Sequence, residues 1–224
     1  MFKRYSYNLS FTSPVWPGNP PAAVVEQMGS IEKGDTANTF KAHIFTHSGT
    51  HVDVPLHFNR NGKTAIDLGV EQFVFHKPVV LDIPKKEQEK ISTEDLKRHH
   101  AAIRECDLLC CKTGWAATRE DNPDYYATYG PYFSSEAVEY LLAEFPGLRA
   151  IGMDFISLGS PLHPQEAVLA HKAATGNDEA DGRFILLFED MILDDELNRA
   201  KRVYAWPLFI EGTDASPTTI VAEF

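Results

Sequence analysis

Cysteine is scarce in this chain, with three residues in 224, all between positions 106 and 111. An odd, clustered set is a poor basis for a disulfide framework, and its spacing does not match that of a zinc knuckle. Cys110 and Cys111 directly follow two leucines in an apolar run. We therefore predict buried and unreactive thiols.

Basic residues are also few. Lys and Arg number 21 against 32 Asp and Glu, which gives a net charge of −11. Nucleic acids and anionic membranes both favour basic surfaces, so this balance disfavours them as partners. The chain has no apolar run long enough to span a membrane and no apolar signal segment after Lys3 and Arg4. We expect a cytoplasmic protein.

The remaining composition is that of a globular protein, with 43% hydrophobic and 24% charged residues. Helical patterns alternate with apolar stretches typical of buried strands, and this alternation predicts an α/β fold. We expect one domain, residues 1–224. The expected helices cover 93–104, 134–145 and 164–176, and the expected buried strands cover 78–83, 107–112, 150–154 and 184–188.

Further strands are expected on apolar and alternating stretches elsewhere in the chain. Ser92 and Asp95 fit a capping box at the start of the first helix. Residues 116–133 carry four tyrosines and are expected to form a long loop whose aromatic rings pack on another part of the protein. The additional strands are expected at 5–10, 24–28, 38–46, 71–75, 202–211 and 218–223.

One short stretch, residues 47–58, concentrates imidazoles and a carboxylate. Gly49 and Pro55 disfavour a helix there, so an extended chain is predicted, with a kink at Gly49. Side chains alternate along an extended chain. The polar residues of one parity are then expected on one face, and the apolar residues of the other parity in the core. The polar set is His47, His51, Asp53 and His57, and the apolar set is Val52, Val54, Leu56 and Phe58.

Such a polar face is costly to bury without a partner, and a divalent metal ion is the natural one. The simpler alternative is a solvent-facing strand with ordinary histidines. Four potential ligands in phase favour the metal, and they suit zinc and manganese equally.

The same stretch has the pattern His-x-Gly-Thr-His-x-Asp-x-Pro-x-His-Phe. On these residues the chain resembles the cyclase family of metal-dependent hydrolases, which includes bacterial kynurenine formamidase and isatin hydrolase. Shorter matches occur at Trp16-Pro-Gly, at Thr113-Gly-Trp and over residues 207–217. The resemblance implies a compact cyclase-like domain with a mixed, barrel-like β core flanked by helices.

The resemblance also implies roles for residues outside this stretch. Ala170-His171 resembles an Ala-His element of the family, and Leu187-Phe-Glu189-Asp resembles its Leu-Glu-Asn element. The family pattern makes His47, His51, Asp53, His171 and Glu189 metal ligands and His57 the proton shuttle, and it favours a substrate-pocket role for the loop with Phe11 and Trp16.

Four features leave alternatives open. Without the resemblance, His171 would be interpreted as a helix histidine bonded to a carbonyl, and Asp190 rivals Glu189. Lys172 replaces a second histidine that often follows in the family. The connection 175–183 looks longer and more acidic than usual, which affects substrate identity rather than metal binding.

The resemblance implies hydrolysis of a small amide, formamide or lactam, first of all N-formylkynurenine and second an isatin-type lactam. A lyase or dehydratase would use the same residues, whereas a silent metal-binding assembly protein would not need His57. No Gly-x-Ser-x-Gly elbow supports a serine nucleophile. Zn²⁺ is the expected ion and Mn²⁺ the alternative, with one or two ions per site. Family members form dimers or tetramers, so a homodimer or homotetramer acting on a small molecule is expected.

Overall fold

The computed structural model describes residues 1–178 and 182–224. Its main sheet has nine strands, and eight of them follow one path from β5 to β6, while β1 pairs with β13. Along that path lie β5 (Val74–Phe75), β12 (Arg202–Pro207), β13 (Ala215–Glu223), β4 (His51–Asp53), β11 (Leu186–Glu189), β10 (Ala150–Met153), β8 (Leu108–Lys112) and β6 (Pro78–Asp82); β1 is Phe2–Arg4.

The sheet is mixed. The strands β6, β8, β10 and β11 are parallel, whereas β4, β13, β12, β5 and β1 are joined by antiparallel pairing. The helices are α1 (Thr93–Lys97), α2 (His100–Arg104), α3 (Pro123–Tyr129), α4 (Ser135–Glu144) and α5 (Pro164–Thr175). The predicted α/β fold with a mixed, barrel-like sheet is confirmed.

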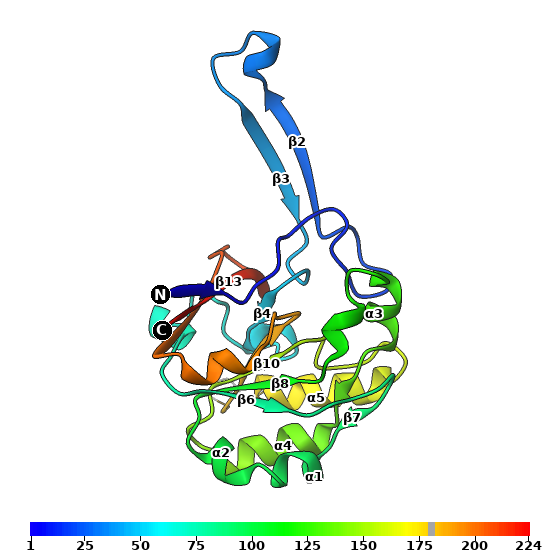
Figure 1. Ribbon diagram of the computed structural model, residues 1–224, viewed down its shortest axis with the longest axis vertical. Helices are drawn as coiled ribbons and strands as arrows, with labels where there is room; N and C mark the ends of the chain where they lie inside the picture. Colours follow the sequence, from blue (N-terminus) through cyan, green and yellow to red (C-terminus); the bar gives the residue numbers. More distant parts are fainter. Residues whose placement is uncertain (179–181) are drawn as a thin grey trace.

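Residues of the parallel strands alternate between two buried clusters, as the two-residue period of a strand requires. Leu109 and Leu187 join the helices in one cluster, while Leu108 and Phe188 face the other, which the antiparallel strands enclose. Figure 1 shows α4 and α5 on the helical side of the sheet. Glu189 has the parity of Leu187, so its side chain belongs on the side of the sheet where α5 packs.

A long hairpin projects from this body (Figure 1). It consists of β2 (Ala23–Gly29), a 3₁₀ turn at Ile31–Lys33 and β3 (Thr39–Ile44), and β2 and β3 pair only with each other among the described residues. A second two-stranded sheet joins β7 (Lys90–Ile91) to β9 (Tyr132–Phe133) in the body. We refer to residues 23–44 as the arm.

Several sequence expectations about local structure are wrong. Residues 5–10 form no strand beyond one bridge at Ser6, because β1 ends at Arg4. The stretch 71–75 begins as a 3₁₀ turn, Val70–Phe73, and only its last two residues pair in the sheet. The helix expected at 93–104 splits into α1 and α2, because the backbone leaves the helical conformation at His99.

The loop expected at 116–133 is also wrong, since it contains α3 and β9. Asn122 caps α3 and Pro123 occupies its first turn, so the sequence did hold a helix start signal there. The prediction that its aromatic rings pack is confirmed in part, because Tyr126 and Tyr132 are buried whereas Tyr129 is 37% exposed. The three cysteines are buried and unpaired as predicted, and burial raises the pKa of the Cys106 thiol to about 12.

The capping box of α1 is confirmed, with Ser92 and Asp95 bonding each other's backbone N–H. Burial alone would raise the pKa of Asp95, but hydrogen bonds from Lys85 and Ser92 lower it to about 2. A carboxyl group with a depressed folded-state pKa stabilises the fold above its unfolded pKa of about 4. This contribution is lost as the pH falls from about 4 to about 2.

We predict that Asp95→Ala lowers the free energy of unfolding by about 1–2 kcal/mol at pH 6, the usual value of a helix cap supported by a partly exposed ion pair. Urea unfolding at pH 6 and at pH 2.5 measures this difference. The difference should be smaller at pH 2.5, where part of the contribution has been lost. An undiminished difference at pH 2.5 would contradict the assignment to the ionised carboxylate.

Candidate metal centre

The histidine-rich stretch is less regular than predicted. Only His51–Asp53 forms a strand; Gly49 has a φ of +58°, which favours glycine, and Pro55–His57 is a 3₁₀ turn. Strand alternation therefore orients His51 and Asp53. The bend at Gly49 orients His47, and the 3₁₀ turn Pro55–His57 orients His57.

The apolar half of that prediction is confirmed only in part. Val52 and Val54 are buried in the core. Leu56 and Phe58 are half-buried, and Phe58 lines the cavity on the polar side. Its ring stacks on His171 with centroids 4.7 Å apart. The 3₁₀ turn breaks the alternation and carries Phe58 to this side.

Strand pairing brings Glu189 to the two ligands predicted on β4. Residue 189 on β11 is paired with His51, and residue 187 with Asp53. His51 Nε2 lies 3.4 Å from Glu189 Oε2 and 3.4 Å from Asp53 Oδ1. These three residues are all buried, and one donor atom from each lies within 4.8 Å of the others. Asp190, the rival of Glu189, is directed away into an ion pair with Arg119.

His171 reaches the same place from α5. Its Nδ1–H donates to Ala167 O at 2.7 Å, which leaves Nε2 facing Glu189 Oε1 at 3.6 Å and Asp53 Oδ2 at 4.0 Å. His51 is held likewise by a 2.8 Å bond from Nδ1 to Gly49 O. An outer bond that fixes the ring and frees the inner nitrogen is typical of metal-binding histidines. The alternative interpretation, a helix histidine bonded to a carbonyl, thus explains Nδ1 of His171 but leaves Nε2 available to a metal ion.

His47 and His57 share a residue that the sequence reasoning missed. Asp214 Oδ2 lies 3.0 Å from His47 Nε2 and 2.8 Å from His57 Nδ1. Asp214 precedes β13 and lies beyond Gly212, at a distance of 157 residues along the chain from His57. Its place in the closing Gly-Thr-Asp motif was the available signal. His47 Nδ1 lies 3.0 Å from Asp53 Oδ1, and His57 Nε2 lies 3.8 Å from Asp53 Oδ2.

The donor atoms fit a divalent cation. His51 Nε2 and both carboxylate oxygens of Asp53 are buried and have no hydrogen bond. Unpaired buried polar atoms cost free energy, and a metal ion would satisfy all three. Imidazole nitrogen and carboxylate oxygen are ordinary ligands of Zn²⁺ and Mn²⁺. Asp53 belongs to two possible ligand groups, one with His51 and Glu189 and one with His47 and His57.

The pKa shifts of Asp53 and His47 also favour a bound cation. Burial raises the pKa of Asp53, but the neighbouring imidazoles, with His57 contributing most, lower that pKa well below its usual value. Burial lowers the pKa of His47, yet Asp214 and Asp53 outweigh it and raise that pKa to about 10. Asp214 and Asp53 thus hold a proton on His47 when no metal is bound, and binding of a metal would release it.

A cavity of about 290 Å³ opens on these groups. All six residues singled out as ligands or shuttle line it, and its other walls are mainly apolar and aromatic. Trp16 is one of these walls. Phe11 is 63% exposed and does not line the cavity, so the prediction for Phe11 is not supported by the geometry. The apolar and aromatic wall residues are Trp16, Phe45, Phe58, Ile156, Ala167 and Val168.

Three features near the site were singled out in the sequence: the end of the helix at 164–176, the acidic connection 175–183 and Lys172. The end of α5 at Thr175 and the stop at Gly176 agree with the sequence. Of the acidic connection 175–183, residues 179–181 lie outside the described part of the chain. Lys172 on α5 does not line the cavity.

Comparison with known proteins decides the family. Residues 5–160 match the family model described as "Putative cyclase". The chain belongs to this family. The matched range includes the whole His47–Phe58 stretch, whereas His171, Glu189 and Asp214 lie beyond it. The predicted family is confirmed.

Two relatives match over nearly the full chain, and a third over about half of it. The kynurenine formamidase of Geobacillus thermodenitrificans is 30% identical over 95% of this chain and 92% of its own length. That of Bacillus thuringiensis subsp. konkukian is 28% identical over 92% and 89%. An uncharacterised protein of Haemophilus influenzae is 33% identical, over 53% of this chain and 83% of its own.

Solved structures agree with the fold. Isatin hydrolase A from Labrenzia aggregata has a TM-score of 0.81 at 19% identity, covering 99% of this chain and 93% of its own. A structure described as a potential metal-dependent hydrolase with cyclase activity has a TM-score of 0.72 at 21% identity, covering 99% and 96%. Within the described residues, no helix has both the length and the apolar character that crossing a membrane requires.

Proposed function

We propose that this family member is a metal-dependent hydrolase of a small aromatic amide, with N-formylkynurenine as the first candidate substrate. The observation that carries the proposal is the set of buried, unpaired donor atoms at the end of an aromatic cavity. Relatives named kynurenine formamidase and neighbours named isatin hydrolase support a reaction at an amide C–N bond.

His47, His51, Asp53, His171 and Glu189 would hold the metal, with Zn²⁺ proposed before Mn²⁺. The bound ion would lower the pKa of a water molecule to about 7 and polarise the scissile carbonyl. Five ligands that include two carboxylates have the capacity for one or two ions, and Asp53 is the residue common to both groups.

His57 would move the proton. Asp214 would accept the hydrogen bond of its Nδ1–H at 2.8 Å, and in the neutral ring Nε2, on the side of Asp53 and the cavity, would then be the nitrogen that can accept a proton. An imidazole in this tautomer can take a proton from water and return it to the leaving amine. Asp214 acts on the reaction through His57 and is a positioning residue.

The walls of the cavity fit a flat aromatic substrate. Trp16, Phe45 and Phe58 contribute aromatic side chains to the walls, and Ile156 and Val168 are among the other apolar residues that line it. No Lys or Arg is among the described residues that line it, so an α-carboxylate has no cationic partner there. This specific observation favours a second candidate, an isatin-type lactam, which carries no carboxylate before hydrolysis.

The test is hydrolysis of N-formyl-L-kynurenine and of isatin by protein stripped of metal and reloaded with Zn²⁺ or Mn²⁺. We expect metal-dependent turnover of one of them, with kcat/KM of about 10⁴ M⁻¹s⁻¹ or more. Product masses that lack the added water would favour a lyase instead. Metal binding with no turnover of any small amide would favour the silent assembly protein.

We also propose that the protein is a homo-oligomer whose arm contacts a second copy. A two-stranded hairpin is marginally stable alone in water. The arm nevertheless exposes large apolar side chains and pairs with nothing else among the described residues. The body also exposes large apolar side chains, at Trp206, Leu208 and Phe209. The exposed large apolar residues of the arm are Val24, Val25, Met28, Ile31, Phe40 and Ile44.

We predict that Val25→Asp combined with Phe40→Asp reduces the assembly to monomers. Both side chains are 62% exposed in the single chain, so the substitutions cost it little, whereas a charge in an apolar interface is costly. Sedimentation equilibrium measures the mass, with Glu26→Gln and Lys41→Gln on the same strands as controls. An unchanged oligomeric mass in the double variant would remove the arm from the interface.

A further inference from the structure

A buried ion pair lies directly behind the candidate metal centre and has no part in the proposed reaction. Asp190 follows Glu189 at the end of β11 and is fully buried. Its carboxylate accepts hydrogen bonds from Arg119 Nε at 2.7 Å and Arg119 Nη2 at 2.6 Å. The hydroxyl of Tyr126 donates a third at 2.7 Å. This bidentate contact with the arginine fixes the orientation of the carboxylate as well as its distance.

The backbone of Asp190 is as constrained as its side chain. Its φ of +53° lies in the left-handed region, which residues other than glycine, asparagine and aspartate seldom adopt. Its N–H donates to Phe155 O at 3.0 Å, and its carbonyl accepts the hydroxyl of Thr50. Thr50 directly precedes His51 on β4. Asp190 therefore joins the strand end that carries Glu189 to the one that carries His51.

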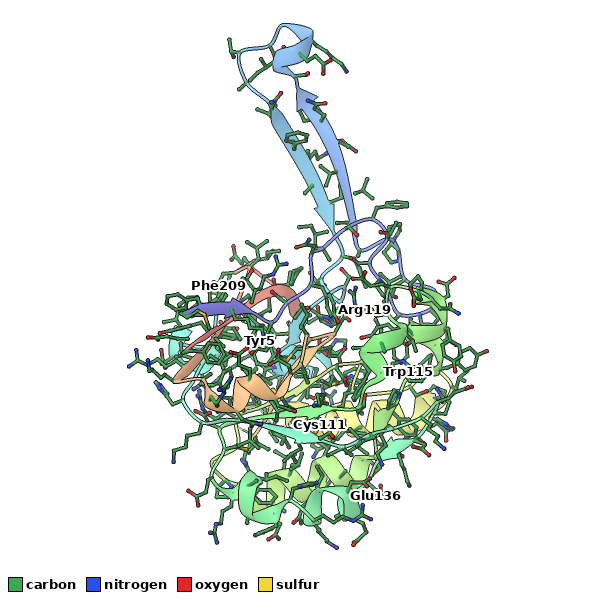
Figure 2. The ribbon with its side chains drawn as sticks, in the orientation of Figure 1. Tyr5, Cys111, Trp115, Arg119, Glu136 and Phe209 are labelled. Carbon is green, nitrogen blue, oxygen red and sulfur yellow. The ribbon has the colours of Figure 1, made fainter. Side chains whose placement is uncertain are left out.

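Arg119 is held just as firmly. It follows the 3₁₀ turn Trp115–Thr118 and is only 6% exposed. Its guanidinium carbon lies 3.7 Å from the centre of the Tyr7 ring, and Tyr7 N–H donates to Thr50 Oγ1 at 2.9 Å. Figure 2 shows Arg119 inside the body, beside α3. The network is thus closed, running from Arg119 through Tyr7 and Thr50 to Asp190 and back.

Glu189 needs such support. Apart from the facing histidines, its side chain has one hydrogen bond among the described residues, from Leu158 N–H to Oε1 at 2.7 Å. The direction of its Cα–Cβ bond depends on the backbone, which turns sharply at the next residue. We propose that Arg119 and Asp190 form a positioning pair that orients Glu189 and His51 for metal binding. The inference rests on the proposed metal centre.

The proposal also gives a role to the tyrosine-rich segment. Arg119 and Tyr126, two of the residues that hold Asp190, both come from residues 116–133. Tyr126 is fully buried, and its hydroxyl also lies 3.3 Å from Asp154 O on the neighbouring strand end. The segment would act on the site from outside the cavity, since none of its residues lines it.

The test is a double-mutant cycle with Asp190→Asn and Arg119→Gln, together with Arg119→Lys. Asparagine accepts the left-handed backbone and keeps the shape of the side chain, but it removes the charge. Lysine keeps the charge and loses the bidentate contact. We expect each single variant to bind Zn²⁺ about 10–100-fold more weakly by chelator competition, and the double variant to lose less than the product of the two. The visible spectrum of the Co²⁺-loaded protein should change as well.

A matched control is the pair of Lys85 and Asp95, at 2.8 Å with side chains 12% and 13% exposed. Lys85→Gln and Asp95→Asn should leave Zn²⁺ affinity unchanged. If Arg119→Gln fails to fold, the two conservative variants still decide the question. Folded Asp190→Asn and Arg119→Lys proteins that bind Zn²⁺ within about threefold of the parent, with the parent's Co²⁺ spectrum, would overturn the inference. A parent that binds no divalent metal would instead overturn the proposed metal centre.

Discussion

Replacing His57 by alanine should abolish turnover and leave the metal in place. His57 Nδ1 is held by the carboxylate of Asp214, which is not one of the five proposed ligands, and His57 Nε2 lies 3.8 Å from Asp53 Oδ2. General acid–base catalysis by a positioned histidine contributes about 10²–10⁴-fold to a rate. We expect kcat to fall by that factor, measured at saturating metal with the substrate that the parent turns over.

Metal content measured on the same His57→Ala sample is the control, and it should equal that of the parent. Asp214→Asn should have a smaller effect in the same direction, because it keeps a hydrogen-bond partner for His57 and removes only the charge. Undiminished kcat in His57→Ala would exclude the proton-shuttle role. Loss of metal together with activity would make His57 a ligand, as its membership in one of the two ligand groups allows.

Asp53→Asn is expected to have the largest effect on metal binding. Asp53 belongs to both ligand groups, and neither of its buried carboxylate oxygens has a hydrogen bond. The amide removes the charge and turns one acceptor into a donor. We expect Zn²⁺ affinity to fall by more than the roughly 100-fold seen when a supporting residue outside the ligand set is changed.

Thermal unfolding with and without Zn²⁺ measures this loss independently of activity. A ligand at 100 times its Kd stabilises the folded state by about 2.7 kcal/mol, so Zn²⁺ should raise the Tm of the parent. It should leave the Tm of Asp53→Asn unchanged. Asp95→Asn, the same substitution on the far helix, should retain the full response. An equal rise in Asp53→Asn would show that the ion binds elsewhere.

The sequence predicted the buried strands because the two-residue alternation of side chains along a strand can be recognised within a few neighbouring residues. Leu108 and Leu109 alternate between two clusters, and any buried strand must do the same. It predicted α5 from Pro164 and Gly176, and α4 from Ser134. It missed α3 even though Asn122 and Pro123 mark its start, because the density of aromatic residues suggested an irregular loop.

In the candidate site too, residues placed by local structure could be predicted from the sequence, and residues placed by long-range packing could not. His51 and Asp53 share a face by strand alternation, which a sequence pattern can express. The approach of His171 depends on the packing of α5, and that of Asp214 on a chain turn far from His57. Neither follows from spacing. His171 was reached through the family resemblance. Asp214 was missed although it lies in the closing Gly-Thr-Asp motif, because that motif does not show that the chain turns toward His57 there.

The residues that flank the arm also line the cavity, so the state of the arm affects how activity should be assayed. Asn19 lies just before β2 and Phe45 follows directly after β3, and both line the cavity. Any contact that steadies the arm also steadies these two walls. If a second copy supplies that contact, specific activity depends on protein concentration and falls on dilution below the dissociation constant of the assembly. Rates measured at nanomolar enzyme would then describe a different species from those measured at micromolar enzyme.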